Sequence, residues 1–147
     1  MTKARVKITD EERQARMQPF MAYWMDRLGL GGWDISWELV DTLPGEATLA
    51  IVTQQGSYTT AHVKFTRKGV DGIPTPYEIE TVIIHELLHV LANPLSVFER
   101  DELGGAGRTA ERLHAAVERV VDNISMILYN LRYNRIPEPV YSPSQKE

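Results

Sequence analysis

Apolar residues recur at helical spacing in the first part of the chain. Thr9 and Glu12 have the spacing of a capping box, and Gly29 is suited to the end of a helix. The apolar side chains between them would share one helix face: Met17, Phe20, Met21, Trp24 and Leu28. This pattern predicts a helix from about residue 10 to Leu28 that packs on a core.

A change from helical spacing to strict alternation follows. Apolar and polar residues alternate over Trp33 to Val40, which predicts a half-buried strand. Residues 46–54 form a less regular apolar run, which we interpret as a second strand, and Tyr58 to Phe65 alternates again. These runs predict a small, mainly antiparallel sheet. Residues 67–75 contain glycine and proline without periodicity, so we expect an irregular connection there.

A second helical pattern covers Glu78 to Asn93. Thr75 and Glu78 match a capping box with Pro76 at the first helical position, and Pro94 predicts the end of the helix. Its apolar face contains Ile83, Leu87, Val90 and Leu91. From Pro94 to about Arg108 we expect a surface loop, with a flap over a site as the alternative.

The last helical pattern begins at Thr109, a good N-cap residue, and continues to about Tyr133. Its predicted core stripe consists of Leu113, Val117, Val120, Val121, Ile124, Ile127, Leu128 and Leu131. Three prolines stand among polar residues after Asn134, so we expect residues 134–147 to be a disordered tail. The sequence therefore predicts one domain over residues 1–133.

Composition limits the classes of function. With 147 residues and 43% hydrophobic residues, the chain can build one core. A formal net charge of −4 argues against nucleic acid or an anionic membrane as the main partner. No run approaches the roughly 20 apolar residues of a membrane span, and the first residues do not resemble a signal peptide, so we expect a cytoplasmic protein. Because cysteine is absent, any metal must be held by histidine and carboxylate.

The candidate chemistry lies in the second helical pattern, which contains the sequence His-Glu-Leu-Leu-His. Residues four apart share one helix face, so His85 and His89 can direct two imidazole nitrogens at one ion. Zinc accepts such ligands, and a catalytic zinc site has three protein ligands and one open position. Glu86 is then placed to accept a proton from a metal-activated water. These three residues predict a zinc site.

A polar stripe on the last helix offers the third ligand. It lies beside the predicted core stripe and consists of Glu111, His114, Glu118, Asp122 and Ser125. Glu118 is the preferred ligand, with His114 and then Glu111 as alternatives. Asp122, one turn after Glu118, can accept a hydrogen bond from the outer nitrogen of a ligand histidine and so orient the ring. If Glu118 binds the metal, His114 can donate to the developing oxyanion or can be an unconnected surface histidine.

These residues resemble a known family. HExxH followed on a later helix by Glu-x-x-x-Asp, here Glu118 to Asp122, resembles the gluzincin branch of the zincin metallopeptidases. The short chain resembles the minimal single-domain zincin-like proteins of bacteria and phages. The resemblance implies zinc held by His85, His89 and Glu118, with Glu86 as general base and acid and Asp122 in the second shell. It also implies an α+β zincin fold: an N-terminal helix, a small twisted sheet, the HExxH helix and a ligand-bearing helix.

The chain also departs from this family. Thermolysin-type gluzincins have Asn before the ligand Glu and Ser before the Asp, where this chain has Val117 and Val121. Their large C-terminal helical domain, which supplies a transition-state histidine, has no counterpart in these 147 residues, so the oxyanion group must come from elsewhere or be missing. The metzincin pattern does not fit, because Ala92 and Leu95 stand where it requires Gly and His.

The expected function is hydrolysis of a peptide bond in a peptide or protein substrate. The zincin resemblance implies an edge strand beside the cleft that pairs with an extended substrate, and the candidate is Tyr58 to Phe65. Tyr58 and His62 project from its polar face as candidate substrate contacts. Two alternatives stay open: a zinc-binding regulatory or structural protein without turnover, and a helical protein in which HExxH is accidental.

Overall fold

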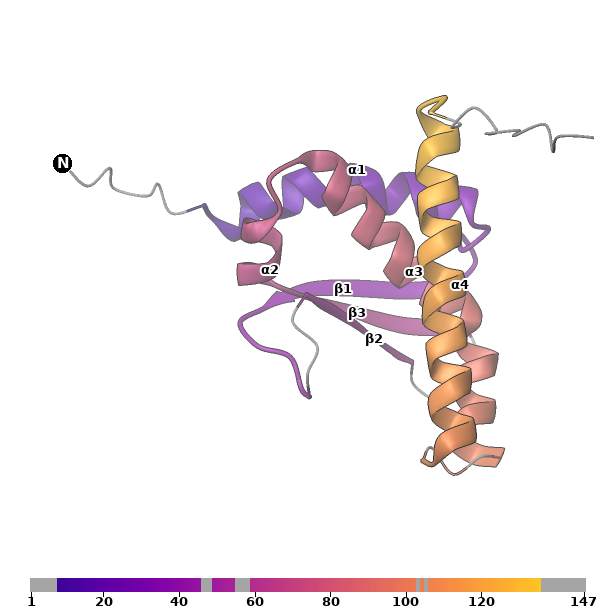
Figure 1. Cartoon of the computed structure of the whole chain (residues 1–147). Helices are drawn as coiled ribbons and strands as arrows, with labels where there is room; N and C mark the ends of the chain where they lie inside the picture. The colour runs from indigo at the N-terminus through magenta and orange to yellow at the C-terminus, as the bar shows by residue number, and fades with distance from the viewer. Residues whose placement is uncertain (1–7, 46–48, 55–58, 103, 105, 136–147) are drawn as a thin grey trace, which may run out of the picture.

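The computed structural model describes residues 8–45, 49–54, 59–102, 104 and 106–135 (Figure 1). The elements in chain order are α1 (Asp10–Arg27), β1 (Asp34–Val40), β2 (Ala50–Gln54), β3 (Thr60–Thr66), α2 (Arg67–Gly72), α3 (Pro76–Glu102) and α4 (Arg108–Arg132). The described residues thus form a mixed α+β fold of four helices and a three-stranded sheet. The predicted fold class is confirmed at this coarse level.

The sheet has the strand order β1-β3-β2. β1 pairs with β3 in parallel, with Trp37 opposite Val63, and β2 pairs with β3 antiparallel, with Val52 opposite Val63. The prediction of a mainly antiparallel sheet is therefore wrong. The prediction that the third strand is an edge strand is also wrong, because both of its edges are hydrogen-bonded. The edge strands are β1 and β2.

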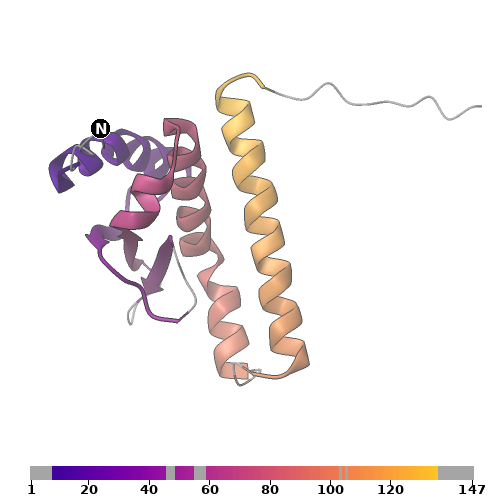
Figure 2. The same cartoon turned by 60° about the vertical axis from the view of Figure 1, so that its left-hand side comes forward.

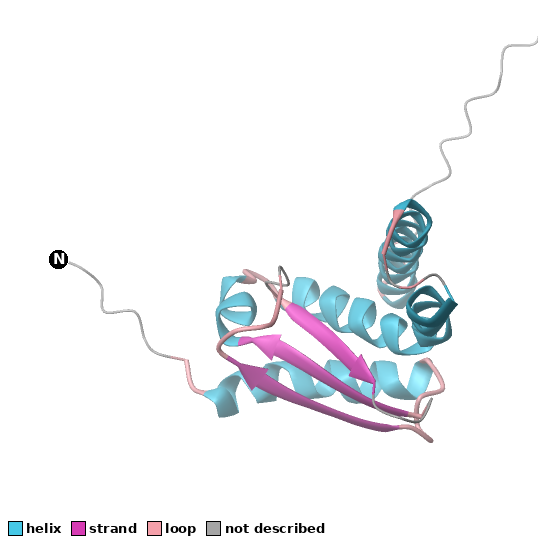
Figure 3. Cartoon of the chain, turned by 90° about the horizontal axis from the view of Figure 1, so that it is seen from below, coloured by secondary structure: helices cyan, strands magenta, loops and turns pink. Residues whose placement is uncertain are grey.

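Helices α1 and α3 lie on one face of the sheet, while Figure 3 looks onto the opposite face, which no described helix covers. The alternation in β3 explains this arrangement. Ala61, Val63 and Phe65 are at most 1% exposed and point toward the helices, whereas the residues between them are partly exposed. Trp37 of β1 packs edge-on against Phe65. The core therefore lies between one sheet face and two helices.

The start and end of α1 follow the local signals. Thr9 Oγ1 accepts a hydrogen bond from the Glu12 amide at 3.2 Å, and Glu12 Oε2 accepts one from the Thr9 amide at 2.8 Å. The predicted capping box is confirmed. Leu28 caps the other end and is followed by Gly29 at φ +71°, a conformation that glycine adopts without strain. The predicted helix is correct to within one residue.

The segment after β3 is helical over Arg67–Gly72, so the predicted irregular connection is wrong for these residues and holds only for residues 73–75. Thr66 Oγ1 caps α2 by accepting a hydrogen bond from the Gly69 amide at 3.1 Å. A Cβ atom at position 69 would lie 2.5 Å from both Leu49 Cδ1 and Thr66 Oγ1. Close packing therefore requires glycine at position 69, and this residue does not break the helix.

Helix α3 begins at Pro76 as predicted, although the Thr75 hydroxyl is buried and has no hydrogen-bond partner in the described part of the chain. The helix does not stop at Pro94 but continues to Glu102, so the predicted loop is wrong for residues 94–102. Proline removes the amide hydrogen that would bond the Val90 carbonyl. That carbonyl instead accepts a hydrogen bond from Gln54 Nε2 at 3.0 Å. A side chain from a distant strand thus compensates for the proline.

Helix α4 runs antiparallel to α3 and lies beside it (Figure 2). Its N-cap is Gly107, so the predicted cap at Thr109 is wrong. Val117 and Val121 are buried, but the predicted core stripe is only half correct. Four of its members are between 39% and 55% exposed: Val120, Ile124, Ile127 and Leu131. The reason is geometric, because only one side of α4 faces a partner element.

A buried carboxylate joins three helices near the end of α4. Glu80 of α3 is fully buried and accepts hydrogen bonds from Trp24 Nε1 of α1 at 2.7 Å and from Tyr133 Oη at 2.6 Å. Arg132 Nη1 also contacts it, and the guanidinium carbon lies 3.7 Å from the centre of the Tyr23 ring. These contacts attach α4 to the rest of the fold.

The chain beyond α4 is described for three further residues, Tyr133, Asn134 and Arg135. The Arg135 amide donates to the Asn130 carbonyl at 2.8 Å, so these residues belong to the end of the helix. Residues 136–147 of the predicted tail lie outside the described residues. None of the described helices combines the length and apolar character needed to cross a membrane.

Candidate metal centre

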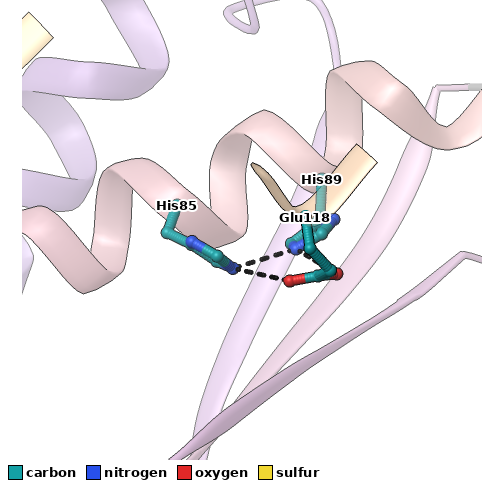
Figure 4. A group of neighbouring side chains, drawn as sticks. All are labelled: His85, His89 and Glu118. Atoms are coloured by element: carbon teal, nitrogen blue, oxygen red, sulfur yellow. Dashed lines mark hydrogen bonds and ion pairs between the residues drawn. The ribbon is translucent and has the colours of Figure 1, made fainter. Parts of the chain in front are cut away.

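The two histidines of the motif lie on one face of α3. Ile83, Leu87 and Val90 are fully buried on the core side and hold the helix against the sheet, whereas Leu91, also predicted for this face, is 40% exposed. His85 and His89 are half-buried, and their Nε2 atoms approach to 3.0 Å (Figure 4). The spacing of four residues has the predicted effect of directing both rings to one point.

Glu118 of α4 completes the group. Its Oε1 lies 3.3 Å from His89 Nε2, and its Oε2 lies 3.6 Å from His85 Nε2 (Figure 4). The ligand atoms of the three residues lie within 4.8 Å of one another, so the group could hold a metal ion. The packing of α3 on α4 brings together residues some thirty positions apart in sequence. Glu111, the weaker candidate, is exposed and not part of this group.

The hydrogen-bond arrangement around His85 fits a cation. Asp122 Oδ1 lies 3.0 Å from His85 Nδ1, the outer nitrogen of the ring. A carboxylate at that position favours the tautomer with the proton on Nδ1, which leaves a lone pair on Nε2. This lone pair points toward the Glu118 carboxylate, which is also an acceptor. Acceptors that converge in this way are stabilised by a cation or a proton between them.

Burial lowers the pKa of His89, while the nearby Glu118 carboxylate partly opposes this effect. Removal of water disfavours the charged imidazolium. The neutral ring is the form that binds metal ions. Burial of this side chain therefore favours metal binding over protonation.

Glu86 lies in the same cleft and is buried, with 8% of its surface exposed. Burial, and secondarily the charge of Glu118, raises the pKa of Glu86 to about 7. A carboxyl group with a pKa near neutrality can both accept and donate a proton at physiological pH. Its position and its pKa suit it to acid–base chemistry.

His114 also lines the cleft. Its Nε2 lies 3.9 Å from Glu118 Oε1, and its side chain is 65% exposed. The structure thus brings His114 next to the candidate metal site while leaving it accessible. This placement suits contact with a bound substrate.

The cleft has a volume of about 370 Å³. One wall is formed by α3 and α4, and the other by the edge strand β2 through Ala50, Ile51, Val52 and Gln54. Asn93 and Ser96 of α3 extend the lining beyond the histidines. The residues of β2 and the two α3 residues were missed by sequence reasoning. Asn93 and Ser96 follow His89 at helical spacing, a signal hidden by the prediction that the helix ends at Asn93.

Of the two predicted substrate contacts, His62 does not lie in the cleft. His62 lies in the central strand and belongs to the partly exposed set of β3 residues on the outer sheet face. Its Nδ1 lies 2.6 Å from Ser36 Oγ, and its Nε2 lies 3.0 Å from Glu38 Oε1, both on β1. It is not among the residues that line the cleft. Tyr58 lies outside the described residues.

No family model, no curated protein and no solved structure matches this chain.

Proposed function

We propose that this protein is a zinc-dependent metallopeptidase. The observation that carries the proposal is the convergence of His85, His89 and Glu118 at one point, with Glu86 buried beside them in an open cleft. Two imidazole nitrogens and one carboxylate are a donor set typical of catalytic zinc. The resemblance to HExxH peptidases supports the choice of zinc and of a peptide substrate.

The three side chains would hold the metal, and Asp122 would keep the His85 ring in the binding tautomer. Bound there, zinc would supply a Lewis acid that makes a water more acidic and polarises a carbonyl group. Glu86 accepts the proton of the attacking water and delivers it to the leaving amine. Burial raises the pKa of Glu86 to about 7 in the metal-free protein, and the positive charge of a bound zinc would lower it toward the carboxylate form that accepts a proton.

The wall formed by β2 supports an extended peptide as substrate. Among the described residues β2 pairs only with β3, so the other edge of this strand would offer main-chain hydrogen-bonding groups to a peptide. An extended peptide added to such an edge is held largely through its backbone. It would run past the metal site, where His114 is placed to donate to the developing negative charge.

The test combines metal analysis with turnover. The purified wild type should contain about one zinc per chain, Glu118→Ala should lose it, and the exposed control Glu111→Ala should keep it. Cleavage of an unstructured protein substrate, followed by mass spectrometry, should disappear in Glu86→Gln while zinc remains. Retained cleavage in that variant would exclude the assigned role of Glu86.

A zinc-binding protein without turnover is the alternative. It accounts for the three ligands, but not for a carboxyl group buried beside them at the cost of its own desolvation. Stoichiometric zinc together with no cleavage of any member of a peptide library would favour this alternative. A wild type that takes up no zinc would exclude both functions.

A further inference from the structure

Helix α3 continues through Pro94, and a contact from outside the helix satisfies the carbonyl group that the proline leaves without a partner. Val90 is fully buried, and its carbonyl group has lost the amide partner that residue 94 normally provides. A buried carbonyl without a partner is rare in native proteins, because it has given up its hydrogen bonds to water. Gln54 Nε2 supplies the missing donor at 3.0 Å. Pro94 therefore leaves the Val90 carbonyl without an amide donor, and Gln54 provides the replacement.

Gln54 is also the last residue of β2, the strand that forms one wall of the cleft. Its neighbours Ala50 and Val52 point to the same side of the sheet, and Gln54 reaches α3 directly after His89. The hydrogen bond thus joins the substrate-facing strand to the helix that carries two candidate metal ligands.

The amide group of Gln54 is used in one orientation. Its Oε1 is buried and has no partner among the described residues. An unpaired buried Oε1 is unfavourable. The side chain is nevertheless held in this orientation, because it lets Nε2 donate to the Val90 carbonyl. A side chain of the same shape without a donor should therefore fail at this position.

We propose that Gln54 is a positioning residue that replaces the missing amide of Pro94 and thereby holds β2 against α3 at His89. The contact sets the orientation of His89 and the separation of the cleft walls. The importance of this contact for a bound metal rests on the proposed function, whereas its effect on the fold does not.

The test is a double-mutant cycle. Gln54→Leu and Gln54→Met, which is closer to glutamine in shape, remove the donor, and Pro94→Ala restores a backbone amide for the Val90 carbonyl. In the wild-type background, each Gln54 variant should lower the melting temperature and weaken zinc binding several-fold in a chelator competition. In the Pro94→Ala background, Gln54→Leu should have a much smaller effect on both. Thr53→Val, on the outer sheet face, is the matched control and should change neither.

The visible spectrum of the cobalt-substituted protein provides a separate reading of ligand geometry. It should change in Gln54→Leu and return toward the wild-type form in the double variant. Equal effects of Gln54→Leu in both backgrounds would overturn the proposal, because the side chain would then act independently of Pro94. Equal zinc affinity in the wild type and Gln54→Leu would also overturn the positioning role. If the wild type binds no zinc at all, the proposed function fails, and the melting temperatures still test the coupling of Gln54 to Pro94.

Discussion

Asp122 shows how one residue outside the metal group can control it. Its carboxylate lies 3.0 Å from His85 Nδ1 and contacts no other member of the group at such a distance. Asp122→Asn would retain the size of the side chain but remove the charge that favours the Nδ1 proton. We expect zinc affinity to fall by about 10- to 100-fold.

Chelator competition measures this change in zinc affinity. Glu111→Gln removes one carboxylate from the exposed side of the same helix and should leave the affinity unchanged. Equal affinities for wild type and Asp122→Asn would mean that the contact does not orient the ring.

Glu86 should make the metal-free protein less stable at high pH. Burial raises its pKa from 4.5 to about 7, so the folded chain binds its proton more tightly than the unfolded chain does. The stability due to this group is therefore fully present below pH 4.5 and is lost as the pH rises through 7. The loss amounts to about 3 kcal/mol at most for a shift of this size.

Chemical unfolding of the chelator-treated protein at pH 5 and pH 8 tests this prediction. Glu86→Gln cannot ionise, so it should be more stable than the wild type at pH 8 and similar to it at pH 5. A wild type that becomes more stable relative to Glu86→Gln as the pH rises would contradict the raised pKa.

At the scale of elements, α4 shows that an apolar pattern can exceed the surface available to cover it. Val120 is 54% exposed and Val121 is 3% exposed, although the two residues are adjacent. Val121→Ala should lower the free energy of unfolding by roughly 2 kcal/mol, through lost burial of two methyl groups and the cavity left behind. Val120→Ala should change it by less than about 0.5 kcal/mol.

Urea unfolding of the two variants provides the measurement. Each variant is the control for the other, because the chemical change and the helix are the same. Equal losses of stability would mean that α4 has a different rotation about its axis, which would also move Glu118 away from the histidines.

At the same scale, α3 shows why Pro94 does not mark the end of a helix. Local rules predict that a helix ends before Pro94, since the proline removes a hydrogen bond within the helix. The helix continues to Glu102, and Gln54, forty residues earlier in the chain, donates to the Val90 carbonyl that the proline leaves without its amide partner. No pattern within a window of neighbouring residues contains this information.

At the scale of the whole molecule, Glu80 connects α1, α3 and the end of α4. Its carboxylate is fully buried and accepts hydrogen bonds from Trp24, Arg132 and Tyr133. Glu80→Gln removes the counter-charge of Arg132 and should lower the free energy of unfolding by about 3 kcal/mol. Burial, together with the hydrogen bond that Tyr133 donates to Glu80, raises the pKa of Tyr133 to about 12.

Thermal and urea unfolding test the contribution of Glu80. Glu78→Gln, two residues earlier on the exposed side of α3, is the matched control and should change the stability by less than about 0.5 kcal/mol. If the two substitutions have equal effects, the buried carboxylate is not needed to attach α4.

The sequence alone determined those features that depend on neighbouring residues. The capping box of α1, the alternation in β1 and β3, and the shared helix face of His85 and His89 all arise from contacts within a few residues. The same periodicity placed Glu118 and Asp122 on one face of α4, where the structure brings both to His85.

The tertiary structure decided what depends on distant parts of the chain. It put β3 between β1 and β2, made β2 the wall of the cleft, and left half of the apolar stripe of α4 exposed. It also carried α3 past Pro94 and buried Glu86 enough to raise its pKa. The physical reason is that periodicity specifies which face of an element is apolar, whereas packing specifies which other element meets that face.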